Sequence, residues 1–178
     1  MSKPGDDNSW KYLALALTLI GFFPFLGSAL KGVLKIAFLF VRKYGLKHID
    51  EALDAAMTWI ITYLRKPEVQ RYVKKHNADE VFTWLAKSVR ELHGRVNTGA
   101  LMKSFDDAIQ MLKGLLGKVT WLPHVGDKAK VTIDMLERVR AQARGPLDAV
   151  NDQLKGILLR LAAKLDEQAL LVRHGIVN

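Results

Sequence analysis

A long apolar run near the N-terminus, broken once by proline and glycine, is the feature that most constrains the fold of this chain. No charged residue occurs from Tyr12 to Leu30, yet Pro24 and Gly27 interrupt the run. Because proline ends helices and glycine adopts turn conformations, the run predicts two apolar helices joined by a turn. We call residues 1–45 the hydrophobic hairpin. A hairpin of this kind enters a membrane, lies under a partner or forms the buried centre of a helical domain, and the sequence leaves all three open.

The rest of the chain also has the periodicity of helices. Apolar residues recur at spacings of three and four, and alternating strand-like runs are nearly absent. We therefore predict an all-α, multi-helix bundle with an N-terminal hydrophobic helical hairpin. Residues 46–178 are the predicted amphipathic helical bundle. Within the hairpin, Ser28 is the predicted N-cap of the second helix and Gly45 its stop.

Several later helix boundaries are also predicted. Asn77, and either Asn97 or Thr98, are the predicted N-caps of two helices. Residues 119–126 are predicted to form a loop, and Gly145–Pro146 to separate the last two helices. The last helix has an apolar stripe at helical spacing, which we interpret as one face of a bundle rather than a coiled coil. The stripe consists of Leu147, Val150, Leu154, Ile157, Leu161 and Leu165.

Positive charge is concentrated in and just after the hairpin. The chain has 27 Lys and Arg against 18 Asp and Glu, a net charge of +9, and residues 1–77 carry 12 basic against 6 acidic residues. A basic patch beside apolar helices favours an anionic membrane surface first and nucleic acid second, with a solvated basic surface as the alternative. The residues predicted to contact anionic lipid are Lys31, Lys35, Arg42 and Lys43.

The length of the hairpin arms bears on how they meet a membrane. The first arm has about 15 residues and reaches roughly 22 Å, whereas a bilayer core of about 30 Å needs about 20 residues. The second arm is amphipathic and suits the membrane interface. Tyr12, Tyr44 and Trp59 are aromatic residues of a kind found at interfaces and also in cores. The predicted membrane or chaperone contacts are Trp10, Leu13, Leu17, Phe22, Phe23, Pro24, Phe25, Leu26, Val33, Phe38 and Phe40.

The sequence has no pattern that indicates catalysis or a metal site. Its five histidines form no close ligand pair, and there is no cysteine. No glycine-rich phosphate loop follows a strand, and no G-x-S-x-G occurs. We therefore predict a protein that is not an enzyme and has no cofactor.

A short stretch from Leu122 to Lys130 resembles the helix-hairpin-helix motif of DNA-binding proteins. In that motif a Pro/Gly hairpin presents backbone N–H groups and a lysine to a phosphate. The candidate phosphate contacts here are Gly126, Lys128 and Lys130, but His124 stands where the motif prefers glycine. A structural corner between two helices, capped by Asp127, is the favoured interpretation.

Most of the chain resembles one family. The segments from Trp10 to Leu17 and from Ile20 to Gly32 resemble the hydrophobic pre-toxin region of bacterial polymorphic toxins, the PAAR- or Rhs-type effectors of type VI secretion. Residues 81–87, 119–130 and 170–176 resemble such regions as well. The motifs are apolar helices, which arise readily in unrelated proteins.

The resemblance implies a role in toxin delivery. A dedicated secretion chaperone shields the hairpin in the cytoplasm, a bacterial export machine secretes the protein, and the membrane-associated hairpin then aids translocation into the target cell. The implied partners are anionic membrane lipids, the chaperone and a C-terminal toxin domain beyond residue 178. The end at Ile176–Val177–Asn178, without a polar tail, leads us to expect a piece of a longer protein.

Two alternatives remain open. In the first, the segment is itself a pore-forming toxin that depolarises the target membrane. In the second, it is a soluble helical interaction module, or a DNA-binding module of the helix-hairpin-helix kind, whose core contains the hairpin. Nucleic acid is not a partner that the delivery role leads us to expect.

Overall fold

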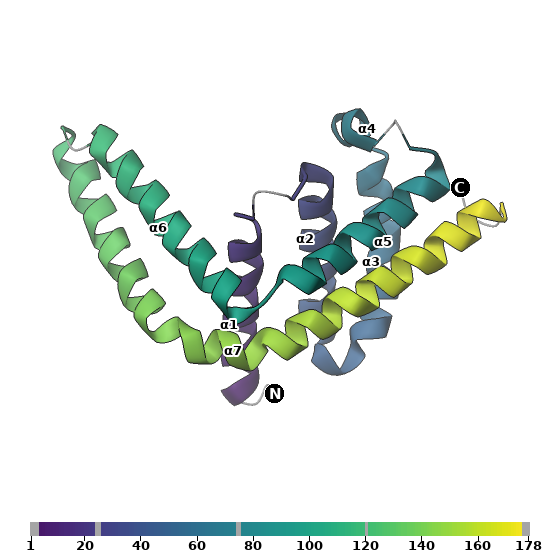
Figure 1. Ribbon diagram of the computed structural model, residues 1–178, viewed down its shortest axis with the longest axis horizontal. Helices are drawn as coiled ribbons and strands as arrows, with labels where there is room; N and C mark the ends of the chain where they lie inside the picture. Colours follow the sequence, from purple (N-terminus) through teal and green to yellow (C-terminus); the bar gives the residue numbers. More distant parts are fainter. Residues whose placement is uncertain (1–3, 24–25, 74–75, 120, 176–178) are drawn as a thin grey trace. The chain divides into compact units, whose positions relative to one another are not determined.

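The computed structural model describes residues 4–23, 26–73, 76–119 and 121–175 (Figure 1). These residues form helices and short connections and include no β-strand, which confirms the predicted all-α fold. The elements in chain order are α1 (Pro4–Ile20), α2 (Ser28–Tyr44), the 3-10 helix η1 (Leu46–His48), α3 (Ile49–Leu64), α4 (Pro67–Val73), α5 (Ala78–Arg95), α6 (Thr98–Val119) and α7 (Pro123–Arg173).

The chain divides into two compact units. Residues 1–24 and 96–152 form the first unit, and residues 25–95 and 153–178 form the second. The two arms of the hydrophobic hairpin therefore belong to different units, since α1 lies in the first and α2 in the second. Residue 45, the predicted domain boundary, lies within the second unit and does not separate the units.

The predicted ends of several helices are found where the sequence placed them. α2 stops at Gly45, whose φ of 95° favours glycine and whose N–H donates to the Val41 carbonyl at 2.8 Å. Asn97 caps α6, because its Oδ1 accepts a hydrogen bond from the Ala100 N–H at 2.8 Å. At the start of α2 the N-cap is Gly27 rather than the predicted Ser28, which is already helical.

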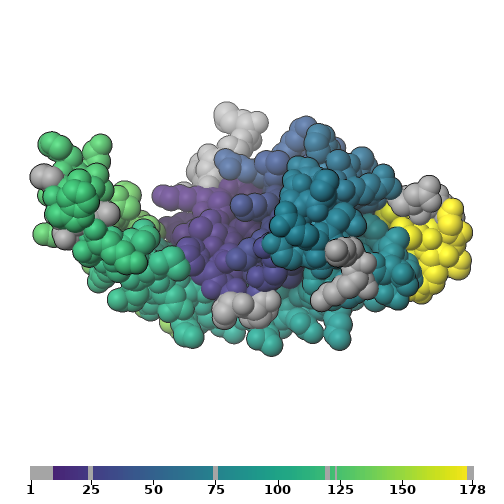
Figure 2. All heavy atoms as spheres, turned by 90° about the horizontal axis from the view of Figure 1, so that it is seen from above, coloured from purple at the N-terminus to yellow at the C-terminus, as the bar shows by residue number. Residues whose placement is uncertain are grey.

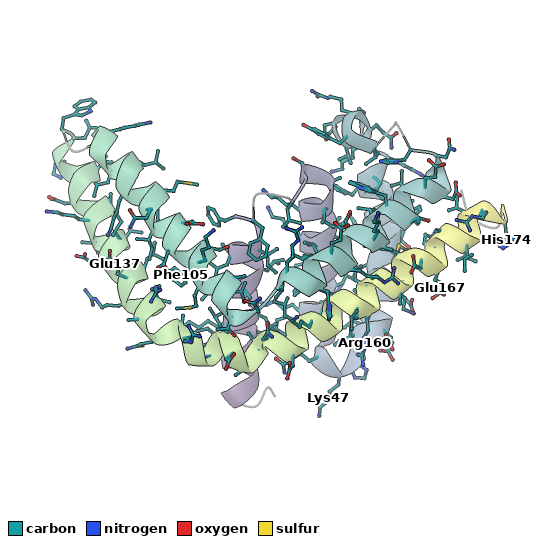
Figure 3. All side chains as sticks on the ribbon, in the orientation of Figure 1. Lys47, Phe105, Glu137, Arg160, Glu167 and His174 are labelled. Atoms are coloured by element: carbon teal, nitrogen blue, oxygen red, sulfur yellow. The ribbon has the colours of Figure 1, made fainter. Side chains whose placement is uncertain are left out.

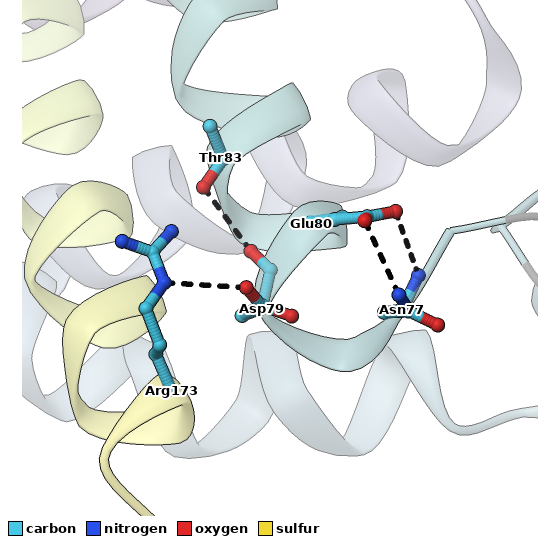
Figure 4. Close-up of polar contacts among 5 residues, drawn as sticks. All are labelled: Asn77, Asp79, Glu80, Thr83 and Arg173. Atoms are coloured by element: carbon cyan, nitrogen blue, oxygen red, sulfur yellow. Dashed lines mark hydrogen bonds and ion pairs between the residues drawn. The ribbon is translucent and has the colours of Figure 1, made fainter.

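At the start of α5, Asn77 donates two hydrogen bonds to Glu80 (Figure 4). The Glu80 carboxylate accepts one hydrogen bond from the Asn77 backbone N–H at 3.1 Å and another from the Asn77 side-chain amide at 3.2 Å. One of the first N–H groups, which have no partner inside the helix, is thereby satisfied. The predicted cap at Asn77 is confirmed, with Glu80 as the acceptor.

The predictions for the last third of the chain are wrong in two places. α7 is continuous from Pro123 to Arg173 and contains Pro146, so the connection before it ends at Leu122 instead of residue 126, and there is no break at Gly145–Pro146. Pro123 begins the helix, where a missing N–H is tolerated. Across Pro146 the buried stripe continues in register through Ala143, Leu147 and Val150, and this burial offsets the cost of an internal proline.

Removing this proline should stabilise the protein. In a continuous helix, Pro146→Ala restores an N–H donor and should raise the free energy of unfolding by up to about 3 kcal/mol. Chemical denaturation followed by circular dichroism measures it. Gly145→Ala is the matched control, since a Cβ at Gly145 meets nothing within 4 Å and the gain should be about 1 kcal/mol. A loss of stability in Pro146→Ala would mean that a turn, not a helix, exists at this point.

The second unit is centred on the packing of α2 against α3. The buried side of α2 includes Val33, Ala37 and Val41, and α3 contributes a buried stripe that includes Ala52 and Ala56. Small residues on both helices allow close approach. These contacts bury the apolar side of the second arm of the hydrophobic hairpin.

Gly32 of α2 lies beside the Tyr63 side chain of α3. A Cβ on Gly32 would lie 2.1 Å from the Tyr63 ring, so any larger residue at this position requires that side chain to move. The Tyr63 hydroxyl donates a hydrogen bond to the Ser28 carbonyl at 3.2 Å, which anchors the ring at the start of α2. Gly32 and Tyr63 therefore form one close contact between the two helices.

A double-mutant cycle should expose this contact. Gly32→Ala gains about 1 kcal/mol of helix propensity but displaces the Tyr63 ring, and overpacking costs about 1–3 kcal/mol. In the parent chain, Gly32→Ala should leave the free energy of unfolding unchanged or lower it. In a Tyr63→Ala background, the same substitution should raise the free energy of unfolding by about 1 kcal/mol. Denaturant titration measures all four proteins. Equal effects in both backgrounds would exclude the contact.

Ion pairs and buried leucines hold the C-terminal part of α7 within the second unit. Arg173 pairs with Asp79 of α5 at 3.3 Å (Figure 4), and Lys164 pairs with Asp54 of α3 at 2.7 Å. Arg90 of α5 pairs with Asp166. The predicted stripe is confirmed, because all six of its residues from Leu147 to Leu165 are buried.

In the first unit, α1 packs against α6, and α6 forms an antiparallel hairpin with the first part of α7 (Figure 1). Three polar contacts cross this hairpin and set its register. Thr98 donates to Asp148 at 2.5 Å, Arg140 binds both carboxylate oxygens of Asp106 at 2.7 and 3.0 Å, and Lys113 pairs with Glu137 at 2.7 Å. Figure 3 labels Phe105 and Glu137 on its two arms.

Candidate membrane-binding surface

Five of the eleven predicted apolar contacts lie inside the protein. Pro24 and Phe25 lie outside the described residues. The others divide by exposure: Leu13, Phe23, Leu26, Val33 and Phe38 are buried, Trp10, Leu17 and Phe40 are half-buried, and Phe22 is exposed. The buried side chains do not reach lipid or a chaperone in this fold, because they pack against neighbouring residues instead.

The predicted lipid-contacting cations lie on the surface of α2. Lys35, Arg42 and Lys43 are exposed, and Lys31 is half-buried. α2 contains no acidic residue. The structure therefore leaves a basic helix face beside the buried apolar one.

The candidate phosphate corner has a different conformation from the one predicted. The Gly126 N–H donates to the Leu122 carbonyl at 2.9 Å as part of α7, so it is not free for a phosphate. Lys128 and Lys130 are exposed on the same helix. The helix-hairpin-helix interpretation thus loses the backbone donor on which it depends, because the helix begins before residue 126.

Apolar and aromatic side chains come together on the outer side of α2 and α3. We define the α2–α3 surface by Lys35, Ile36, Leu39, Phe40, Lys43 and Tyr44 of α2 and Trp59 of α3. The Phe40 ring centre lies 6.3 Å from that of Trp59 and 6.4 Å from that of Tyr44. Leu39 is 65% exposed and Trp59 is 61% exposed. Large apolar groups this open to water are typical of interaction sites when they cluster.

Helix geometry explains why these side chains point outward. Ala37 and Val41, on either side of Leu39 in the sequence, are buried. A step of two residues on a helix turns the side chain by about 200°, so Leu39 faces away from the core. On α3, Trp59 lies outside the buried stripe and between the exposed Thr58 and the buried Ile60.

The charges around this apolar cluster are mainly positive. Lys35, Leu39 and Lys43 follow one another at spacings of four, so a leucine lies between two exposed lysines along one helix face. At the start of α3, the acidic Glu51 has a nearby partner, because its Oε2 lies 3.8 Å from His48 Nδ1. The α2–α3 surface therefore combines exposed apolar side chains with lysines on either side of Leu39.

A hollow of about 280 Å³ lies beyond the Tyr63 end of α3. Its walls carry one acidic group and two cations, Glu68, Lys66 and Arg71, beside the rings of Tyr63 and Tyr72. Burial raises the pKa of the Tyr63 hydroxyl, and the nearby Glu68 carboxylate raises it further. Tyr63 therefore stays neutral and keeps its hydrogen bond to α2 throughout the neutral pH range.

Sequence reasoning named the two lysines of this surface and Phe40 as predicted membrane contacts, but it did not name the other apolar residues as part of the site. Trp59 and Tyr44 were recognised as residues typical of interfaces without being placed at the site, and Leu39 was not recognised. The spacing of Lys35, Leu39 and Lys43 was the available signal. The four-residue period puts the leucine on the same face as the lysines and outside the buried stripe.

Comparisons with protein-family models, with curated proteins and with solved structures found no match to this chain. Within the part of the chain that the structure describes, no helix has both the length and the apolar composition needed to cross a membrane.

Proposed function

We propose that this chain is a non-catalytic helical module that binds the surface of anionic membranes and serves in the delivery of a secreted bacterial toxin. One observation carries the proposal. The α2–α3 surface exposes Leu39 and Trp59 by more than half, and Lys35 and Lys43 flank Leu39 along α2.

The chemistry of this surface suits the interface between lipid headgroups and acyl chains. Tryptophan and tyrosine favour that depth, because their rings are apolar and their N–H and O–H groups still reach water. A lysine buries its aliphatic stem and leaves its ammonium among the headgroups. Each such cation contributes about 1 kcal/mol at an anionic surface. α2 lies in the plane of the membrane in this arrangement.

The delivery role extends this proposal along the lines of the pre-toxin resemblance. Before export, a dedicated chaperone covers the α2–α3 surface and prevents aggregation of its exposed apolar side chains. After export, the same surface attaches the module, and any toxin domain that follows it, to the target membrane. Membrane attachment is the step that this chain's own residues perform.

Flotation with lipid vesicles tests membrane binding. The chain should float with phosphatidylcholine vesicles that contain phosphatidylserine and much less with phosphatidylcholine alone. Leu39→Glu/Trp59→Glu should lower partitioning at least about tenfold, because two apolar anchors become anions. Leu159→Glu/Leu170→Glu is the matched control. It places the same charges at two exposed leucines of α7 and should bind much more strongly than the Leu39/Trp59 variant. Equal losses in both variants, or no flotation of the parent chain, would contradict the proposal.

Removing the flanking cations tests the electrostatic part. Lys35→Ala/Lys43→Ala should lower partitioning onto anionic vesicles by roughly 20- to 30-fold at low salt, because two lysines contribute about 1 kcal/mol each. The difference should shrink as salt screens the surface charge. Lys87→Ala/Lys103→Ala removes two exposed lysines outside the α2–α3 surface and is the control. If both variants lost the same affinity, net charge alone would drive binding.

A further inference from the structure

The far half of the α6–α7 hairpin exposes many apolar side chains. We define the hairpin tip as residues 110–136, which lie in the first compact unit. Figure 2 shows this part of the chain in green. The six large apolar side chains that are about half exposed or more are Met111, Leu115, Trp121, Val125, Val131 and Met135, from 47% at Val125 to 75% at Trp121.

The exposure of these apolar groups is not caused by a separation of α6 from α7. Ile109 of α6 and Ile133 of α7 are buried. Lys113 pairs with Glu137 across the hairpin at 2.7 Å. The two helices are therefore already joined in the tip region, and the exposed residues lie on its outer sides.

Both helices carry apolar groups on their outer sides. On α6, Met111 is two positions after the buried Ile109; on α7, Val131 and Met135 flank the buried Ile133 at two positions each. A step of two residues turns a side chain by about 200°, so these three groups point away from the partner helix. An α-helical partner would need one continuous stripe, as in other helix pairs. Apolar groups on opposite outer sides suit an apolar medium that surrounds the tip.

The charges at the end of the hairpin are mainly positive. Lys118, Lys128 and Lys130 are exposed there, against the single acidic side chain of Asp127 among residues 118–130. Trp121 lies at the turn, and its ring N–H donates to the Lys118 carbonyl at 3.1 Å. An exposed tryptophan among lysines is typical of segments that reach the headgroup region of a bilayer.

We infer that the hairpin tip is a second membrane contact, which dips into an anionic bilayer to the depth of the headgroups and upper acyl chains. Trp121 and Val125 enter first, and Lys118, Lys128 and Lys130 bind lipid phosphates around them. The two lysines that the sequence marked as candidate phosphate contacts thereby bind lipid phosphate instead of DNA. Insertion to about 5–10 Å is enough for this mode and does not require a spanning helix.

This inference rests on the proposed membrane binding but uses residues of the other compact unit. Because both units belong to one chain, two contacts raise the overall affinity above that of either alone. Loss of the tip should therefore weaken vesicle binding without abolishing it.

Single-cysteine labelling of the full chain separates the two contacts, because the natural sequence has no cysteine. Leu39→Cys, Val125→Cys and Gln142→Cys each receive an environment-sensitive nitrobenzoxadiazole dye. Gln142 is exposed on α7 outside the tip and is the control. With vesicles of phosphatidylcholine and phosphatidylserine, the dyes at positions 39 and 125 should shift to the blue and be quenched by doxyl-labelled lipid. The dye at position 142 should change little.

Each result decides between the two proposals. A response at position 39 without one at position 125 would overturn the hairpin contact and leave the proposed function in place. Silence at all three positions, with no flotation, would overturn both. A blue shift at position 125 that depends on protein concentration and needs no vesicles would mean that a second copy of the chain covers the tip, which also overturns the inference.

An unlabelled variant gives an independent measure. Leu115→Glu/Val125→Glu should lower partitioning onto anionic vesicles at least about fivefold, since each apolar anchor contributes on the order of 1 kcal/mol. Circular dichroism and thermal unfolding should be unchanged, because both residues are about half exposed. Unchanged partitioning would contradict the inference.

Discussion

The packing of α2 against α3 is the interaction on which the rest of the second unit depends. Gly32 leaves room for the Tyr63 ring, and that ring donates a hydrogen bond back to Ser28. This close approach buries the apolar side of α2, which the sequence alone allowed to enter a membrane. It also fixes which side of α2 faces water, so the same contact that builds the core creates the α2–α3 surface.

One side of α2 is therefore buried in the core, and its other side is exposed to water. Val33 and Phe38 stabilise the fold, whereas Leu39 stays in water, where it contributes nothing to the core. An exposed leucine between two lysines is common as an isolated feature. Phe40 of the same helix lies near Trp59 of α3, with ring centres 6.3 Å apart, and this aromatic pair together with the exposed Leu39 supports the membrane proposal.

In the first unit, buried and exposed apolar residues also lie in different places, at the base and at the tip of the α6–α7 hairpin. Near the base of the α6–α7 hairpin, buried residues such as Leu101, Phe105 and Leu147 provide a packed core. Toward the tip, two helices joined by Lys113 and Glu137 expose apolar groups on their outer sides. A two-helix hairpin has too little surface of its own to cover such groups, so they stay exposed to water in this structure.

The sequence by itself determined the helical class, the ends of most helices and the buried stripe of α7, because spacing, caps and glycine act locally. It did not determine which apolar face became core, since that depends on which helix packs against it. The predicted break at Pro146 was wrong for the same reason. Local signals favoured a stop, but burial of Ala143, Leu147 and Val150 in one stripe stabilised a continuous helix. Only the tertiary structure brought Phe40 and Trp59 together, because they lie on two helices whose register is set by packing.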